Sequence, residues 1–192
     1  TPTGALLEVL TTAGTVRAMG LFGNSVWVSD DEDGLNAIDA TTDASSPPSS
    51  TFAYAVPAQS PITEMVDTGD GAFSAIDADD NLWLVNDTPP GTLETLRTLV
   101  WEGGAWSDVD SGLADADIVS SATDQQDLYL GFSNGSVVRC ALTDCAPTMD
   151  LMFAIADTSF DAEFATQAMV VVGNALYLGG SDGSLWQLDT DS

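Results

Sequence analysis

The fold is decided by the stretch Gly173-Asn-Ala-Leu-Tyr-Leu-Gly-Gly-Ser-Asp-Gly-Ser-Leu-Trp-Gln-Leu-Asp189. Its apolar residues Leu176 to Leu178 predict a short strand, and residues 184–188 predict a second strand that runs back beside the first. The Ser181-Asp182-Gly183 segment between them predicts a tight turn, because glycine adopts positive φ without a Cβ clash and aspartate can bond its own backbone. The stretch is therefore expected to form a β-hairpin.

The same hairpin pattern recurs along the chain. Each copy is marked by an aromatic residue at the centre of an apolar triplet: Trp27, Trp83, Tyr129 and Tyr177. These aromatic residues are separated by 56, 46 and 48 positions. The first and last copies agree most closely, since Ala18-Met19 recurs as Ala168-Met169 at an offset of 150 residues. Repetition at this spacing predicts four structural units of about 48 residues.

Each unit consists of three or four short apolar segments separated by turn residues, and no segment has convincing helical periodicity. The units cover approximately residues 13–56, 62–110, 115–156 and 162–192, with one further strand at residues 4–12. This pattern predicts an all-β fold, namely a single β-propeller domain of about four blades over residues 1–192.

The last unit is one strand short, and an open sheet edge exposes unpaired backbone groups. We therefore expect Ala5–Leu10, from strand 4–12, to pair beside Ser184–Asp189 as the outer strand of the fourth blade. Pairing within one chain closes a four-bladed ring and is favoured by the tether. Pairing across two chains instead gives self-association by strand exchange.

The charge of the chain is extreme. It has 30 acidic residues, three arginines, no lysine and no histidine, so the net charge is −27. Nucleic acids and anionic membranes both require a cationic patch, and we expect this chain to bind neither. No run approaches the roughly 18 apolar residues of a membrane helix, so no membrane insertion is expected. The acidity fits either salt-rich surroundings, where ions screen the repulsion, or the binding of specific cations.

The two cysteines, Cys140 and Cys145, are only five residues apart. A metal site built on them would lack its remaining ligands, because the chain has no further cysteine and no histidine. The spacing instead favours a local disulfide between the two, as found in exported proteins. We therefore expect a secreted or cell-surface protein, in an extracellular or periplasmic location.

The segment Trp101–Gly112, followed by Asp127–Gly131, is similar to the DG-x-AW…SG…DVYAVG repeat of secreted β-propeller proteins of the myxobacterial type. The segment Val138–Cys145 resembles an RCPLxGC strand and turn of the same proteins. The fourth unit also resembles the LYxGxxDGxLxxLD repeat of quinoprotein-like propellers. These motifs build blades, so the resemblance implies a propeller fold and export, and it carries no catalytic residues across.

Two groups of polar residues have the alternating spacing of calcium-binding loops. Asp31 and Asp33 form the first group, although Ala40 stands where such a loop needs its closing glutamate. The second group, which repeats the D-x-D-x-N spacing, consists of Asp77, Asp79 and Asn81. Calcium is the only cofactor that the sequence suggests. The alternative is that both segments are solvated acidic turns.

Trp101 and Trp106 flank the turn at residues 102–104, and we expect them to contact a ligand or a partner. Packing in a core is the alternative, because buried tryptophans contribute large apolar surfaces to protein cores.

The sequence offers little to a catalytic mechanism. Acid–base chemistry would fall to carboxylates, and no pair of aspartates is singled out by its spacing. Nucleophile elbows and phosphate-binding loops are absent from the sequence. We therefore expect a non-enzymatic structural or interaction propeller, with a protein or glycan partner at a cell surface or in an extracellular assembly. The alternatives are a carbohydrate-binding propeller and a carboxylate-dependent glycosidase.

Overall fold

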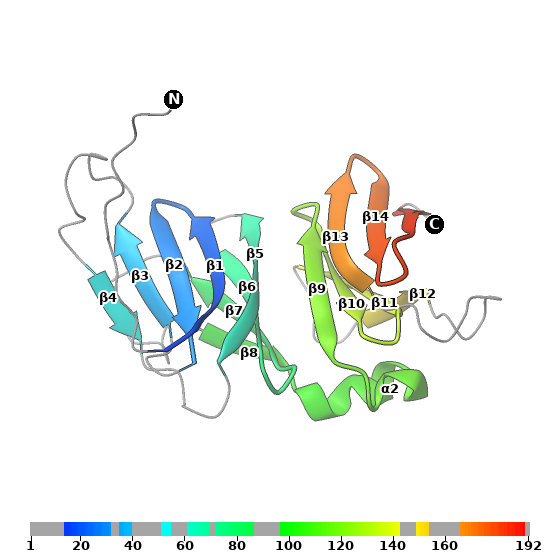
Figure 1. The fold of residues 1–192 in the computed structure, drawn as a ribbon, viewed down its shortest axis with the longest axis horizontal. Helices are drawn as coiled ribbons and strands as arrows, with labels where there is room; N and C mark the ends of the chain where they lie inside the picture. The colour runs from blue at the N-terminus through cyan, green and yellow to red at the C-terminus, as the bar shows by residue number, and fades with distance from the viewer. Residues whose placement is uncertain are drawn as a thin grey trace.

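The computed structural model describes residues 14–31, 35–39, 51–54, 61–69, 72–86, 97–142, 149–153 and 166–190. These residues form four antiparallel sheets, in each of which consecutive strands are neighbours (Figure 1). The predicted all-β fold is therefore confirmed. The strand expected at residues 4–12, and its pairing with the last blade, lie outside the described residues.

We call the sheets blades 1 to 4 in chain order. Blade 1 contains β1 (Val16–Phe22), β2 (Ser25–Asp30), β3 (Leu35–Asp39) and β4 (Thr51–Tyr54). Blade 2 contains β5 (Ile62–Gly69), β6 (Ala72–Asp77), β7 (Leu82–Asn86) and β8 (Arg97–Trp101). Blade 3 contains β9 (Ile118–Thr123), β10 (Asp127–Phe132), β11 (Val137–Ala141) and β12 (Met149–Phe153). Blade 4 contains β13 (Thr166–Val172), β14 (Ala175–Gly180) and β15 (Leu185–Asp189).

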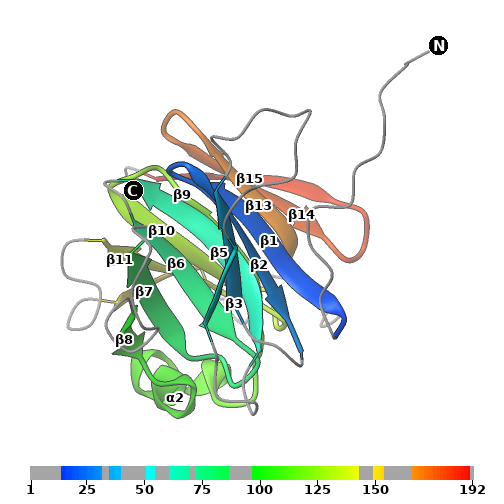
Figure 2. The same cartoon turned by 90° about the vertical axis from the view of Figure 1, so that its left-hand side faces the viewer.

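The first strands of successive blades pack side by side: β1 lies beside β5, β5 beside β9, and β9 beside β13 (Figures 1 and 2). All four of these strands run in the same direction (Figure 1). The blades therefore follow one another as a series. Each blade has a rear face, toward the blade before it, and a forward face, toward the blade after it.

An apolar cluster fills each of the three junctions between successive blades. Blades 1 and 2 meet through Phe22, Trp27, Leu35, Ile62, Phe73 and Val85. Blades 2 and 3 meet through Ile76, Leu82, Leu128, Leu130 and Phe132, with Trp106 and Leu113 packed against them. Blades 3 and 4 meet through Ala122, Tyr129, Leu176 and Leu178, with Met169 and Val171 packed against them. The core of the molecule thus consists of these junctions.

Blade 2 departs from the predicted repeat. The Leu82-Trp83-Leu84 triplet lies on the third strand of its blade, β7, whereas the other triplets lie on second strands. The second strand of blade 2 is β6, in which Ser74 interrupts the apolar run even though its side chain is buried. A search for unbroken apolar triplets therefore selects the strand after it.

A helical segment joins blades 2 and 3, although the sequence showed no convincing helical periodicity. It comprises η1 (Gly103–Ala105), α2 (Trp106–Val109) and η2 (Ser111–Leu113), and it joins β8 to β9. The segment lies at the end of the molecule opposite the β1–β2 and β13–β14 hairpins (Figure 1). Its helices are too short to produce a periodic pattern in the sequence. In the part of the chain that the structure describes, no helix is long and apolar enough to cross a membrane.

Phe73 lies at the centre of the junction between blades 1 and 2. It is fully buried, and its ring stacks on Phe22 with centroids 4.3 Å apart and lies 5.1 Å from the Trp27 ring. We expect Phe73→Ala to lower the free energy of unfolding by about 3–5 kcal/mol, because it removes buried apolar surface and leaves a cavity.

Urea unfolding followed by tryptophan fluorescence measures this loss. Gln167→Ala, at an exposed position of β13, is the control and should change the free energy of unfolding by less than about 0.5 kcal/mol. A similarly small effect of Phe73→Ala would mean that the junction does not stabilise the fold.

Candidate functional site

The β6–β7 turn contains the second predicted calcium group, and its centre is the buried carboxylate of Asp77. Asp77 Oδ1 accepts hydrogen bonds from Asp79 N (3.0 Å), Asn81 N (3.0 Å) and Asn81 Nδ2 (3.1 Å). Asp77 Oδ2 accepts from Asn81 Nδ2 (3.0 Å) and Trp83 Nε1 (2.8 Å). Both oxygens are thus engaged by N–H donors, so this carboxylate acts as the organiser of a turn.

The same turn connects blade 2 to the helical segment and to blade 3. Asn81 Oδ1 accepts a hydrogen bond from Gly103 N (2.9 Å), and the Asp80 carbonyl accepts one from Trp106 Nε1 (2.9 Å). Asp80 Oδ1 accepts a third from Ile118 N (2.9 Å). Burial raises the pKa of Asp80, although the Ile118 N–H opposes this shift. The predicted calcium ligands therefore lie in a structural joint between two blades.

The first predicted calcium group is described only at Asp31, since Asp33 lies outside the described residues. Asp31 accepts a hydrogen bond from Thr15 N (2.7 Å) and forms an ion pair with Arg17 (2.6 Å). These two contacts lower the pKa of Asp31. No group of three or more cysteine, aspartate or glutamate side chains within the described ranges is arranged to hold a metal ion. Calcium binding stays a prediction.

The two predicted ligand-contacting tryptophans lie in the junction between blades 2 and 3. Trp106 is fully buried, with its ring 5.3 Å from Phe132 and 5.6 Å from Trp101. This position corresponds to the core alternative, because Trp106 presents no surface to a ligand. Trp101 is half-buried in the same cluster, and a ligand contact there stays a prediction.

The predicted disulfide is described at one end only. Cys140 is buried in the junction between blades 2 and 3, whereas Cys145 lies outside the described residues. The bond between them therefore stays a prediction.

A second aspartate organises the β9–β10 turn, which lies at the end of the molecule opposite the helical segment (Figure 1). Asp124 Oδ1 accepts hydrogen bonds from Gln126 N (2.8 Å) and Asp127 N (2.7 Å), and Asp124 Oδ2 accepts one from the Tyr129 hydroxyl (3.1 Å). Burial acts to raise the pKa of Asp124, but these bonds outweigh it and the pKa is lowered. Burial and the neighbouring Asp124 charge raise the pKa of Tyr129 to about 12.

Gln125, at the tip of this turn, has a left-handed backbone with φ of 73°. Its N–H donates to Thr123 Oγ1 (2.9 Å). The adjacent β5–β6 hairpin tip approaches it, since a Cβ added to Gly69 would lie 4.0 Å from Gln125 Cδ. A residue with a Cβ rarely adopts this conformation, which costs of order 1–3 kcal/mol and recurs at binding sites. Sequence reasoning missed Gln125, because glycine and asparagine are the usual signals of positive φ.

Two hollows adjoin Gln125. The larger, which we call the Gln125 groove, has a volume of about 480 Å³ and is lined by residues that include Thr68, Gly69, Gln126, Asp127 and Leu142. The smaller has a volume of about 320 Å³ and is lined by residues that include Asp67, Ser121, Thr123 and Val170. Both hollows present amide, hydroxyl and carboxylate groups beside apolar side chains such as Leu84 and Met169, which suits a ligand with polar and apolar parts.

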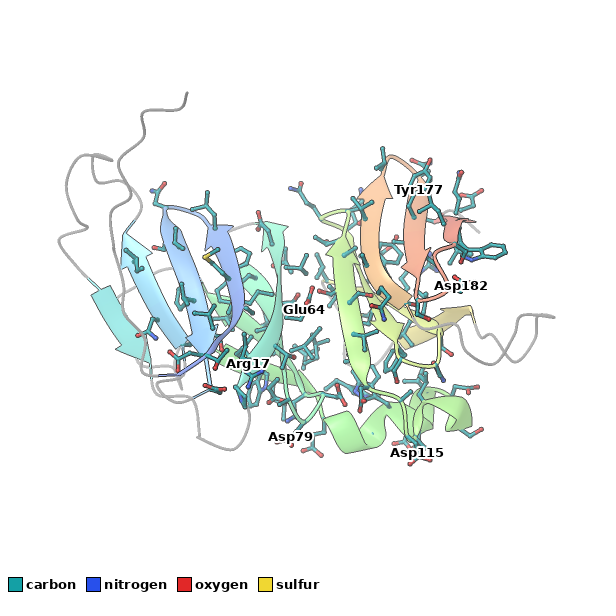
Figure 3. All side chains as sticks on the ribbon, viewed as in Figure 1. Arg17, Glu64, Asp79, Asp115, Tyr177 and Asp182 are labelled. Atoms are coloured by element: carbon teal, nitrogen blue, oxygen red, sulfur yellow. The ribbon has the colours of Figure 1, made fainter. Side chains whose placement is uncertain are left out.

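Glu64 is a half-buried carboxylate between β5 and β9 (Figure 3). Ser121 Oγ donates a hydrogen bond to Glu64 Oε1 (3.2 Å), which links blade 2 to blade 3. Burial raises the pKa of Glu64, although the hydrogen bonds from Ser121 partly oppose the shift. A carboxyl group in this setting can exchange a proton closer to neutral pH than a solvated glutamate does.

Solved β-propellers have the same architecture. The computationally designed protein Ika4 superposes with a TM-score of 0.61 and 11% identity, over 98% of this chain and 99% of its own. The β-propeller domain of Cps50 (Swd1) from Myceliophteria thermophila superposes with a TM-score of 0.62 and 10% sequence identity. The match covers 97% of this chain and 55% of the Cps50 chain. BamB from Moraxella catarrhalis superposes with a TM-score of 0.57 and 12% sequence identity. The match covers 95% of this chain and 49% of the BamB chain.

These similarities confirm the predicted propeller fold. The chain spans about half the length of the Cps50 and BamB chains that it matches. No protein-family profile and no curated protein matches the sequence. The narrower resemblance to myxobacterial-type repeats therefore stays an expectation.

Asp77 provides a test of the turn-organising role. We expect Asp77→Ala to lower the free energy of unfolding by at least about 2 kcal/mol, because it leaves buried N–H donors without their charged acceptor. Asp77→Asn keeps one oxygen and should lose less. Asp115→Ala removes the same charge from an exposed position and is the control. Thermal and urea unfolding measure all three variants.

The wild type and the Asp77→Ala variant also test whether calcium binds at this turn. At matched ionic strength, calcium and sodium should stabilise the wild type equally, since screening acts for both ions. A rise in melting temperature with calcium that is confined to the wild type and lost in Asp77→Ala would show that a cation displaces these N–H donors.

Glu64 predicts a pH dependence of stability. A carboxyl whose pKa is raised by folding stabilises the fold at low pH, and this contribution is lost as the pH rises through the folded pKa. Glu64→Gln keeps an acceptor for Ser121 without the charge, so its melting temperature should exceed the wild-type value at pH 7. The difference should shrink toward pH 5. Glu102→Gln, at an exposed position, should show no such trend. A difference that is independent of pH would contradict the assignment.

Proposed function

We propose that this chain is a non-catalytic interaction module that binds a protein partner at the Gln125 groove. The observation that carries the proposal is the left-handed backbone of Gln125, held by hydrogen bonds to the Thr123 hydroxyl and the Asp124 carboxylate, at the edge of a groove between two blades. Such strain persists only where its surroundings enforce it, and it is enriched where a side chain must be presented to a ligand. Propellers are widely used as interaction scaffolds, which supports the same proposal.

The chemistry of the groove defines the partner class. Gln125 and Gln126 offer amide donors and acceptors, Thr68 offers a hydroxyl, and Asp127 contributes negative charge. The net charge of −27 attracts cationic partners over distances set by the ionic strength. We infer that the partner presents an extended polar segment that contains lysine or arginine.

A binding role accounts for the carboxylates better than a catalytic one. Asp77 and Asp124 use both of their oxygens as acceptors within turns, which leaves neither free to transfer a proton to a substrate. A glycosidase would need a second carboxylate within about 5–10 Å of Glu64. Asp67 lines the neighbouring hollow, but its Oδ1 accepts the Gly69 N–H (2.8 Å).

The proposed location is extracellular or periplasmic. The acidic surface and the predicted Cys140–Cys145 bond both support export. A partner at a cell surface or in an extracellular assembly follows from that location.

A glycan partner is the second candidate, and Trp186 is the observation that favours it. Trp186 lies on β15 and is 39% exposed, which leaves an aromatic face open to a sugar ring. Its Nε1 donates to Ser184 Oγ (2.6 Å), and the Ser184 hydroxyl donates to Asp182 Oδ1 (2.6 Å), so the ring has a fixed polar surround.

Peptide and glycan arrays separate the two candidates. The wild type should bind lysine- and arginine-containing peptides and not their acidic counterparts, and added salt should weaken the binding. Gln125→Gly keeps the positive φ and removes the amide, so it should weaken peptide binding about tenfold, as loss of a hydrogen-bonding group does. Gln187→Ala, on exposed β15, should bind as the wild type does.

Two outcomes would overturn the proposal. Binding to glycans that is lost in Trp186→Ala and kept in Gln125→Gly would establish the second candidate. Turnover on a panel of polysaccharides and esters, abolished by a single Asp→Asn or Glu→Gln change, would establish an enzyme.

A further inference from the structure

The two ends of the blade series expose apolar side chains. Met19 and Leu21, on the rear face of blade 1, are 69% and 62% exposed. Val170, Val172 and Leu185, on the forward face of blade 4, are 54%, 61% and 73% exposed. Among the described strands, β1 and β13 do not pack against each other as the first strands of successive blades do. Within the described residues, neither end of the series is covered by another blade.

The repeat identifies what the rear face of blade 1 is built to meet. Met19 and Leu21 correspond to Met169 and Val171 of blade 4, at the same offset of 150 residues that relates the first and last copies. Met169 and Val171 pack against the cluster that contains Tyr129, on the forward face of blade 3. The positions that are exposed in blade 1 are thus the positions that receive the preceding blade elsewhere in the chain.

The forward face of blade 4 likewise exposes positions that are buried in a junction elsewhere in the chain. Val172 and Leu185 correspond to Phe22 and Leu35 of blade 1 at the offset of 150 residues. Phe22 and Leu35 are both buried in the junction with blade 2. Blade 1 uses these positions to pack on blade 2, whereas in blade 4 the same positions are exposed to solvent.

The rear face of blade 1 and the forward face of blade 4 therefore have the residue types that meet at the junctions between successive blades. The side chains that identify them are all apolar, so contact between the faces requires no charge neutralisation even though the net charge is −27. The chain matches about half the length of the Cps50 and BamB chains. Its own first and last described blades do not pack on each other, so these faces need another occupant.

We propose that two copies of this chain close into one eight-bladed ring, in which the forward face of blade 4 of each copy packs on the rear face of blade 1 of the other. The contact is head-to-tail and occurs twice, so a two-fold axis relates the copies and no face remains open. Eight blades lie within the range of known propellers. The inference is independent of the Gln125 groove, which lies between blades 2 and 3 of one copy.

Native mass spectrometry and light scattering of the full chain test the ring. The expected mass is twice the chain mass of 19.9 kDa, without higher species. Added sodium chloride should strengthen the assembly, because it screens the repulsion between two acidic copies. Leu21→Asp on the rear face and Val172→Asp on the forward face should each give monomers, because either change buries an unpaired charge at both contacts.

Three matched measurements make this result specific. Leu99→Asp places the same charge on an exposed apolar position of blade 2 and should leave the dimer intact. Circular dichroism should show that all variants are folded. Mixing the Leu21→Asp and Val172→Asp proteins should give a one-to-one complex, because one has a free forward face and the other a free rear face.

Several outcomes would overturn the proposal. A wild type that is monomeric at all concentrations and salt levels would do so, and so would an open filament. A dimer that persists in either single variant would point to contact between identical faces. A monomer that dimerises only after residues 1–12 are removed would identify that segment as the occupant of the open faces. Gln125→Gly should leave the mass unchanged whatever its effect on peptide binding.

Discussion

Aspartate carboxylates that accept backbone N–H groups close several turns of these antiparallel sheets, and the strands that these turns join depend on them. Asp67, Asp124 and Asp182 each accept an N–H two residues further along the chain, and so does Asp77. Asp77 and Asp124 also fix the indole of Trp83 and the hydroxyl of Tyr129. An ionised acceptor forms a stronger hydrogen bond than a neutral one, so each turn fixes the register of the two strands that it joins. That register decides which side chains reach the blade junctions.

The acidic composition of the chain is therefore partly a consequence of its turns. Part of the negative charge is structural, because the carboxylates replace backbone acceptors at reversals of the chain. Little of the remaining charge is neutralised within the described residues, where Arg17 pairs with Asp31 and Arg139 donates to the Thr190 carbonyl (3.0 Å). The apolar junctions must therefore offset a repulsion that ions in the surroundings reduce. Aromatic rings are well suited to this, since each buries a large apolar area at one position.

The sequence was sufficient to predict the four sheets, because paired apolar strands and glycine-containing turns recur at a regular spacing. In blade 2 the triplet pattern selected the third strand, β7, because buried Ser74 interrupts the apolar run of the second strand, β6. Sequence reasoning missed the helical segment, since a single turn around Trp106 leaves no periodicity to detect. For Asp77 the spacing indicated a turn organised by carboxylate oxygens, and the structure shows this turn with N–H donors on both oxygens. Spacing alone does not separate this role from calcium binding, because the same oxygens serve both. Gln125 left no signal, because its backbone conformation is imposed by Thr123 and Asp124 rather than encoded by its own residue type.

Hydrogen bonds to two aspartates affect how far into acid these carboxylates stay ionised. The Ser184 hydroxyl and N–H lower the pKa of Asp182, and the Thr15 N–H and Arg17 lower the pKa of Asp31, both from an ordinary value of 3.8. The isoelectric point of the sequence is about 4.1, so the molecule loses its net charge while these two carboxylates are still ionised. At the pH where the repulsion between molecules is smallest, we therefore expect these two contacts still to be formed.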